Sequence, residues 1–227
     1  GFDAVEEFHA AKKILFGMEY GFIHRTVRFA AILPQTLMLL ISGASPGVYY
    51  FTPVVASLIS TFFLFRTSVL IIGRIPAFIV VALYSVFPQV MVDGVHPRVS
   101  SFSVMYMLIA LYFLVLFFRR CTQNSTVSGS RLLVGAAIAV FLMYLAKEDT
   151  LVFLPVFFLM VWESRRRLAD LMLFGGLLLF LYFGETLLYA MLTDFTLGRL
   201  DVIRSGHLEN INLIPVKSVL HLFDRFR

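Results

Sequence analysis

The sequence has little of the charge that a water-soluble protein carries on its surface. Charged residues make up 15% of its 227 residues, whereas soluble domains carry about 25%. Hydrophobic residues reach 59%, and the mean hydropathy is +0.88. A single compact core cannot hide so much apolar surface. The composition therefore excludes a soluble enzyme and indicates an integral membrane protein that has the lipid bilayer as a partner.

Cysteine is also nearly absent. The chain has one cysteine, which excludes a disulfide framework and a cysteine-based metal cluster. Lys and Arg outnumber Asp and Glu by 19 to 14, and the net charge is +5. The basic residues are nevertheless scattered between apolar blocks instead of forming one solvated face, so the sequence excludes binding of nucleic acid.

Long apolar runs take the place of the missing charge. Barrel strands would alternate polar and apolar residues, and these runs are apolar all round, so they predict helices. We expect an all-α, polytopic transmembrane bundle of about six spans, since a crossing takes about 20 helical residues. An N-terminal pair of amphipathic or interfacial helices precedes it. The apolar blocks run approximately 27–42, 48–65, 69–92, 102–118, 131–146, 150–162 and 169–192.

Two of these blocks, 131–146 and 150–162, are short and are separated by charged residues. They fit either a helical hairpin with tilted arms or a re-entrant pair.

Loop charges predict the orientation of the chain, because short loops rich in Lys and Arg stay in the cytoplasm. If 27–42 lies along the membrane and 48–65 is the first crossing, the loops fall into two alternating sets. The arginine-rich set is predicted to be cytoplasmic and the acid-rich set extracytoplasmic. The first contains Arg66, Arg74, Arg119, Arg120, Arg131 and Arg165–Arg167, and the second contains residues 1–26, 93–101, 147–149 and those after 193.

This topology divides the chain into three parts. Residues 1–44 form the first extracytoplasmic loop with its interfacial helices, 45–193 form the transmembrane bundle, and 194–227 form an extracytoplasmic segment. The chain opens on Gly1 without a signal-like segment. We therefore expect an upstream helix to be missing and the chain to be a segment of a longer protein.

Ionisable residues gather near helix ends on the predicted outer side. Packed helices would bring three short loops together around one outward cavity, and charges near apolar helix ends tend to mark substrate or ion paths. Carboxylates mixed with basic groups suit an anionic substrate and a base, or a divalent metal. The three loops carry Asp3, Glu6 and Glu7; Asp93, His96 and Arg98; and Lys147, Glu148 and Asp149.

The first 45 residues carry the most informative pattern. Their spacing predicts a short amphipathic helix over 3–16, a turn at Gly17 and a second helix beyond it. The stretch resembles the first extracytoplasmic loop of the GT-C glycosyltransferase superfamily, especially the group of protein mannosyltransferases and aminoarabinose transferases (glycosyltransferase family 39-like). The resemblance is carried by Asp3, Phe8, Ala10 or Ala11, Gly17, Arg25 and Arg28, Pro34, and Gly43.

Two later segments resemble the same group in the same order. Residues 135–155, which include Lys147-Glu148, are similar to its "G…GLA…TKE…LP" segment, and 184–200 resemble a segment that follows a later helix. Two positions depart from the pattern. Ala4 stands where many members have a second acid, and either Asp93 or His96 stands where members often have an acid before the next helix.

The resemblance implies a transferase that uses a polyprenyl-phosphate-linked sugar as donor. The acceptor would be an extracytoplasmic lipid, glycan or protein, and the enzyme would reside in the plasma (inner) membrane of a bacterium. Asp3 would act as general base on the acceptor hydroxyl. With Asp93 and a third acid it would also suit a divalent metal, although the spacing does not demand one.

The resemblance also implies which side chains would bind the substrate. Arginine binds a phosphate in bidentate fashion and lysine binds it as a point charge. Asp93 and His96 would form a further polar site in the second loop. The residues expected at the lipid phosphate and substrate are Arg25, Arg28, Arg98, Lys147 and Glu148.

Simpler roles stay open for these residues. Asp3 also fits a helix N-cap, Arg25 and Arg28 fit headgroup anchors, and Lys147-Glu148 fits an ion pair at a hairpin tip. The alternative function is a secondary transporter. Transporters place charges near the midplane and often show internal repeats, and this sequence shows neither. A non-catalytic membrane scaffold is a third interpretation.

Overall fold

The computed structural model describes residues 2–18, 27–43, 46–95, 99–122, 129–163 and 167–192. Every regular element within these ranges is a helix, so the all-α class is confirmed. The predicted segment 194–227 lies outside these ranges. The helices are α1 (Phe2–Phe16), α2 (Phe29–Ser42), α3 (Pro46–Ile72), α4 (Arg74–Val86), α5 (Pro88–Val95), α6 (Val99–Thr122), α7 (Gly129–Ala146), the 3₁₀ helix η1 (Glu148–Phe153), α8 (Leu154–Trp162) and α9 (Arg167–Leu192).

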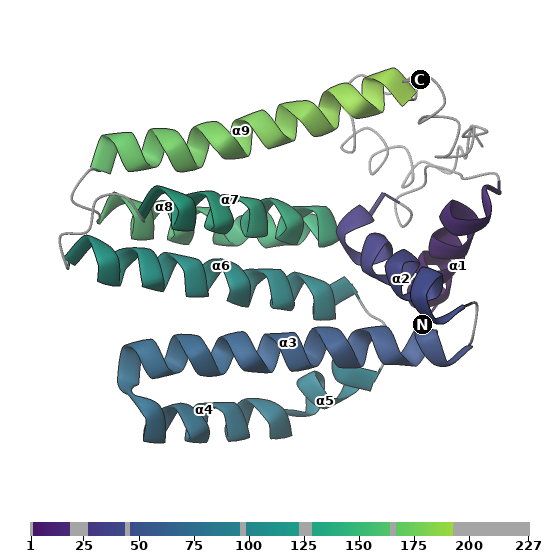
Figure 1. Ribbon diagram of the computed structural model, residues 1–227, viewed down its shortest axis with the longest axis horizontal. Coiled ribbons are helices and arrows are strands. Elements are labelled where there is room, and N and C mark those ends of the chain that lie inside the picture. The colour runs from purple at the N-terminus through teal and green to yellow at the C-terminus, as the bar shows by residue number, and fades with distance from the viewer. Residues whose placement is uncertain are drawn as a thin grey trace.

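Four of the described helices are long and apolar enough to cross a bilayer. These spans are Gly47–Ile72 in α3, Ser100–Cys121 in α6, Gly129–Ala146 in α7 and Leu168–Met191 in α9. Their axes run side by side in Figure 1. The protein is therefore a polytopic helical membrane protein, as the apolar runs predict.

Two blocks expected to be crossings form shorter helices. Gly73 adopts a left-handed φ of 87° and separates α3 from α4. Phe87 is extended and separates α4 from α5, because the residue before a proline avoids the helical region. The 13-residue α4 and then α5 lead the chain back along α3 (Figure 1). The block at 150–162 forms η1 and the nine-residue α8.

The pair 131–146 and 150–162 folds as a hairpin. After α7, the chain turns at Lys147, and η1 and α8 return it toward the start of α9 (Figure 1). This is the first of the two arrangements that the sequence left open.

The main hydrophobic core lies between α6 and α7. Small residues face large ones there: Ala110, Ala136 and Ala137 are buried together with Phe102 and Leu114. Small side chains let membrane helices approach closely, which gives packing contacts that lipid cannot replace. Half of the α7 span is buried, against 11% of the α9 span, so α7 is central and α9 is peripheral.

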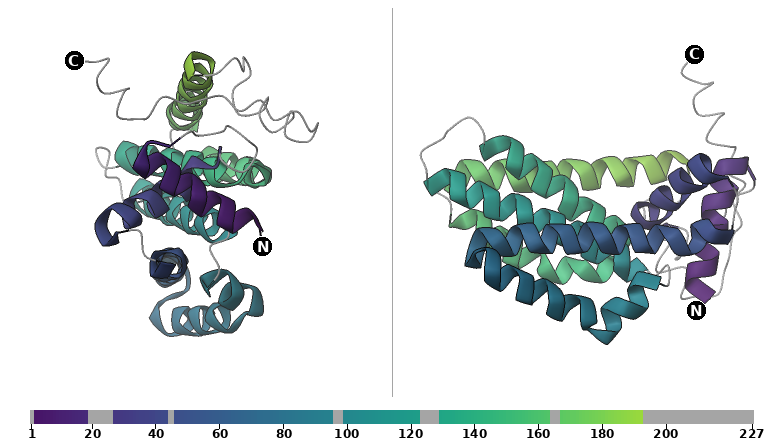
Figure 2. Two further views of the ribbon diagram at one scale, coloured as in Figure 1. Left: turned by 90° about the vertical axis from the view of Figure 1, so that its right-hand side faces the viewer. Right: turned by 60° about the horizontal axis from the view of Figure 1, so that its bottom comes forward.

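A second hydrophobic cluster fixes α1 and α2 at one end of the bundle. Figure 2 shows α1 lying across that end. Phe8 and Ala11 of α1 pack with Ile32 of α2, and Tyr189 near the end of α9 joins them. The helix α1 ends at Phe16 and is followed by Gly17 with a φ of 65°. The helix predicted over 3–16 and its turn are thus present.

Where the structure describes them, the two predicted sets of charged residues lie at opposite ends of the bundle (Figure 1). The arginines at one end include Arg74 at the start of α4, Arg119 and Arg120 at the end of α6, and Arg131 at the start of α7. The other end holds α1, the end of α7 and η1. Exposed apolar side chains cover the sides between them, including Phe180 and Phe183 of α9, as expected for helices that contact lipid.

Candidate active site

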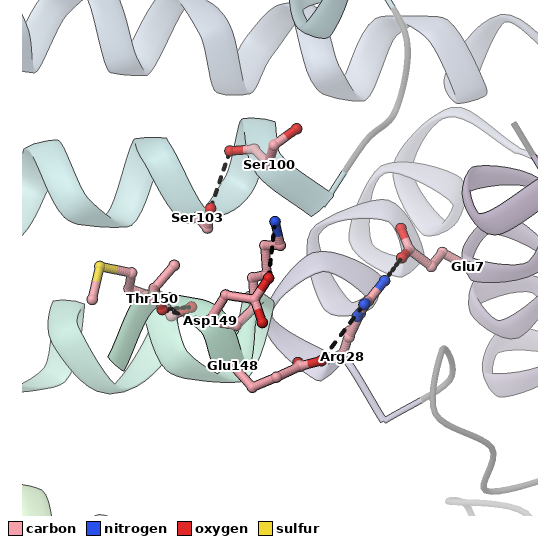
Figure 3. A network of polar contacts seen from close by, with 9 residues as sticks. Glu7, Arg28, Ser100, Ser103, Glu148, Asp149 and Thr150 are labelled. Atoms are coloured by element: carbon pink, nitrogen blue, oxygen red, sulfur yellow. Dashed lines mark hydrogen bonds and ion pairs between the residues drawn. The ribbon is translucent and has the colours of Figure 1, made fainter. Parts of the chain in front are cut away.

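Arg28 joins two acidic residues from distant parts of the chain. It precedes α2, and its Nη1 atom donates a hydrogen bond to Oε1 of Glu7 on α1 over 3.4 Å. Its Nη2 atom lies 3.7 Å from Oε1 of Glu148 in η1. Figure 3 shows the guanidinium between the two carboxylates. The network therefore ties the first loop to the turn that follows α7.

The two acids differ in their exposure to solvent. The side chain of Glu7 is 0% exposed and that of Glu148 is 19% exposed, while Arg28 is 10% exposed. Buried charges need such partners, because an ion removed from water loses its hydration. The planar guanidinium presents several N–H donors. Here it contacts two carboxylates, instead of binding both oxygens of a single one.

Lys147 and Asp149 form a second ion pair beside the first. The Nζ atom of Lys147 lies 3.3 Å from Oδ2 of Asp149, with side chains 39% and 73% exposed. Water screens such an exposed pair, so it contributes little to stability. Lys147 is therefore a partly exposed cation that immediately precedes Glu148 in the chain, and Figure 3 shows its partner Asp149 in the same turn as Glu148.

Backbone contacts hold this turn in place. The buried hydroxyl of Thr150 lies within hydrogen-bonding distance of the carbonyl oxygens of Met143 and Lys147. These carbonyls belong to the last turn of α7 and its cap, where helices leave acceptors without intrahelical donors. On the facing side, the hydroxyl of Tyr106 on α6 donates to the carbonyl of Ala30 over 3.0 Å. This bond fixes the start of α2 next to Arg28.

Two of the predicted site residues, Arg28 and Glu148, meet in this network, and Lys147 precedes Glu148 in the chain and pairs with Asp149. Asp3 lies in the first turn of α1, four residues before Glu7, and Asp93 lies in α5. The side chains of both are outside the described residues. Arg25, His96 and Arg98 also lie outside the described ranges.

Sequence reasoning placed Glu7 among the loop acids but did not select it as a site residue. A signal for it was present. Phe8, Ala10 and Ala11 form the apolar face of α1, and Glu7 lies on that face. An acid within the buried stripe of an amphipathic helix needs a partner, and the partner here is Arg28. The three-way contact itself depends on η1, which sequence spacing does not place.

No cluster of three potential metal ligands occurs among His, Cys, Asp and Glu in the part of the chain that is described. Since Asp3 and Asp93 have side chains outside that part, the metal site considered from the sequence stays a prediction.

An apolar pocket of about 460 Å³ lies between α7, α8 and α9. Tyr144, Phe158 and Tyr182 line it, and Leu151 of η1 places it beside the turn that holds Lys147 and Glu148. Binding sites for small molecules commonly have volumes of about 300–1,000 Å³ and mostly apolar walls. The pocket is thus suited to a hydrocarbon chain.

Comparison with known protein families gives a match over most of the chain. Residues 29–189 match the family described as dolichyl-phosphate-mannose-protein mannosyltransferase. Searches of curated proteins and of solved structures each returned no significant match. The matched range contains Lys147, Glu148 and the apolar pocket, and it begins one residue after Arg28 and beyond α1. It covers most of the chain, and it decides against the transporter alternative. The chain belongs to the dolichyl-phosphate-mannose-protein mannosyltransferase family and is a membrane glycosyltransferase of the GT-C type.

Proposed function

We propose that the protein transfers a sugar from a polyprenyl-phosphate-linked donor to an extracytoplasmic acceptor such as a lipid, a glycan or a protein. The observation that carries the proposal is the contact of Arg28 with both Glu7 and Glu148 in a chain of this family. Through this contact α1, with Asp3, lies at the same end of the bundle as Lys147. Had they been at opposite ends, Asp3 could not act on a donor held by Lys147.

The donor has three chemically distinct parts, and we propose a place for each. The polyprenyl chain would lie in the apolar pocket between α7, α8 and α9, because its walls expose almost only hydrocarbon. Its phosphate would lie next to Lys147 and Arg28, which supply positive charge where the pocket reaches η1. The sugar would then project past the ends of the helices toward α1.

Transfer then needs a base near the acceptor. Asp3 would accept the proton of the acceptor hydroxyl while its oxygen forms a bond to the anomeric carbon of the sugar. The bond between that carbon and the phosphate oxygen breaks, and the lipid phosphate leaves with the electron pair. General base catalysis requires the carboxylate within about 2.6–3.2 Å of the hydroxyl oxygen. A position in the first turn of α1, four residues before Glu7, is compatible with this role.

The arginine-rich end would lie in the cytoplasm and the network end outside it. Arg74, Arg119, Arg120 and Arg131 cluster at the first end, as the positive-inside rule requires. We propose the plasma membrane of a bacterium as the location, with the reaction on its outer face.

The substitution Asp3→Asn tests the proposal. It removes the base while keeping the shape of the side chain, and we expect sugar transfer to fall by a factor of about 10² or more. The measurement uses the purified full-length protein, polyprenyl-phosphate sugars carrying a labelled sugar, and extracts that contain the acceptor. Asp170→Asn, at the opposite end of the bundle, is the matched control. If Asp3→Asn transfers sugar at the rate of the control, Asp3 is not the general base.

A further inference from the structure

The two acids that contact Arg28 are not equivalent. Glu7 is fully buried and accepts a hydrogen bond from Arg28. Glu148 is more exposed, and its Oε1 atom lies 3.7 Å from Nη2 of Arg28. This distance is too long for a hydrogen bond, so the contact is an ion pair alone. Glu148 is also the first residue of the short 3₁₀ helix η1, whereas Glu7 lies in the 15-residue helix α1, which packs in the second hydrophobic cluster. Replacing Glu148 as a partner of Arg28 therefore costs less free energy than replacing Glu7.

We propose that the Glu148 carboxylate occupies the position that the lipid phosphate takes on Arg28, and that the two compete for it. The inference rests on the proposed function, because it concerns the same phosphate site. A carboxylate and a phosphate present similar oxygen acceptors to a guanidinium. While the site is empty, Glu148 compensates the charge of Arg28. When the donor binds, its phosphate replaces Glu148 and Glu7 keeps the guanidinium in place.

This competition has a consequence for product release. The sugar-linked donor is a phosphodiester with one negative charge, whereas the released lipid phosphate is a monoester with about 1.5 to 2 negative charges at pH 7. Arg28 and Lys147 therefore attract the product more strongly than the donor. A carboxylate that returns to Arg28 opposes this attraction and favours departure of the product. Glu148 is thus a positioning residue that weakens binding of the lipid phosphate.

The test is the affinity of the purified protein, in detergent micelles, for polyprenyl monophosphate. In Glu148→Gln the side chain keeps its shape and loses the charge that competes for Arg28. We expect binding to become tighter by about two- to fivefold, the range of a partly exposed ion pair. Inhibition of transfer by added polyprenyl phosphate should strengthen in parallel. A purely structural role of Glu148 would weaken binding instead.

Glu163→Gln is the matched control, because it removes the same charge from the same kind of side chain at an exposed position after α8, far from Arg28 and Lys147. We expect its affinity to stay within a factor of about 1.5 of the wild type. Thermal unfolding of both variants identifies any loss of folded protein. Weaker or unchanged binding in Glu148→Gln would overturn the inference. Equal tightening in Glu163→Gln would also overturn it, because the effect would then be a general one of net charge.

The same measurements separate this inference from the proposed function. If the wild type transfers sugar but Glu148→Gln binds lipid phosphate no more tightly, only the competition is wrong. If the wild type neither binds polyprenyl phosphate nor transfers sugar from its conjugates, the proposed function fails and the competition fails with it.

Discussion

At the scale of single residues, Arg28 connects parts of the chain that do not follow one another in sequence. It contacts Glu7 of α1 and Glu148 of η1, and its own backbone begins α2. The carbonyl of Arg28 accepts hydrogen bonds from the amides of Ala31 and Ile32. The position of its guanidinium is therefore set by the helix as well as by the two acids.

The substitution Arg28→Gln should destabilise the protein by about 3 kcal/mol, because it removes the cation that faces a fully buried carboxylate. The double variant Glu7→Gln/Arg28→Gln should recover part of this loss, since no charge then stays buried. Denaturant unfolding in detergent gives the unfolding free energies of Arg28→Gln, Glu7→Gln and the double variant. If the loss in the double variant equals the sum of the losses in the two single variants, Glu7 and Arg28 are not coupled.

The sequence allowed part of this network to be predicted. The family resemblance predicts that Arg28, Lys147 and Glu148 belong to one site. In the structure Arg28 lies 3.7 Å from Glu148, and Lys147 is the residue before Glu148. Glu7 was not selected, because an acid in an amphipathic N-terminal helix resembles an ordinary solvated residue. Its place on the apolar face of α1 distinguishes it from such a residue, but its contact with Arg28 depends on how α1 packs across the bundle.

At the scale of helices, the close contact of α6 and α7 depends on glycine as well as alanine. A Cβ atom on Gly135 would lie 3.2 Å from the ring of Phe113. A Cβ atom on Gly129 would lie 3.3 Å from Phe117. These distances are shorter than ordinary van der Waals contacts of about 3.5–4.0 Å. The two glycines thus set how closely the helices approach along the main core.

The substitution Gly135→Leu should therefore separate α6 from α7 and destabilise the fold by about 1–3 kcal/mol. Gly176→Leu on α9 is the control, because a Cβ atom there has no neighbour within 4 Å. It should be neutral or slightly stabilising, since leucine favours helices more than glycine does. Unfolding of the two variants in detergent gives the comparison. An equal loss of unfolding free energy in both variants would show that the close approach of α6 and α7 does not determine the stability of the fold.

Helix boundaries were less predictable than helix class. Hydropathy alone joined 69–92 into one block, because Gly73 and Pro88 change the average little. In the structure these two positions are where helices begin or end, since they act on backbone geometry and not on hydrophobicity. Apolar runs therefore predict which segments are helical, but they do not predict the helix ends at Gly73 and Pro88.

At the scale of the whole molecule, the ends of the bundle carry opposite kinds of loops. The partition predicted from loop charges matches the arrangement of α1, η1 and the arginine-bearing helix ends. The partition can be predicted without knowledge of tertiary contacts, because each membrane crossing places the next loop on the opposite side of the membrane. The packing of α1 and α2 across one end could not be predicted in the same way, since it depends on the contacts of Phe8, Ile32 and Tyr189.

The proposed orientation can be tested by labelling single cysteines in intact cells. Cys121 is first replaced by serine, and a cysteine is then introduced as Asp149→Cys or as Arg74→Cys, both at exposed positions. We expect a membrane-impermeant maleimide to label the first and to label the second only after permeabilisation. Labelling of Arg74→Cys in intact cells would reverse the proposed orientation.

The position of the apolar pocket bears on how the enzyme meets its donor. The pocket lies between α7, α8 and α9, and Leu179 on its wall is 69% exposed on the side of the bundle. A lipid-linked donor would therefore arrive by lateral diffusion within the leaflet and would not pass through water. Its effective concentration is then a surface density. The rate of transfer should therefore depend on the mole fraction of donor in the membrane, and diluting the donor with inert phospholipid should slow transfer at constant bulk concentration.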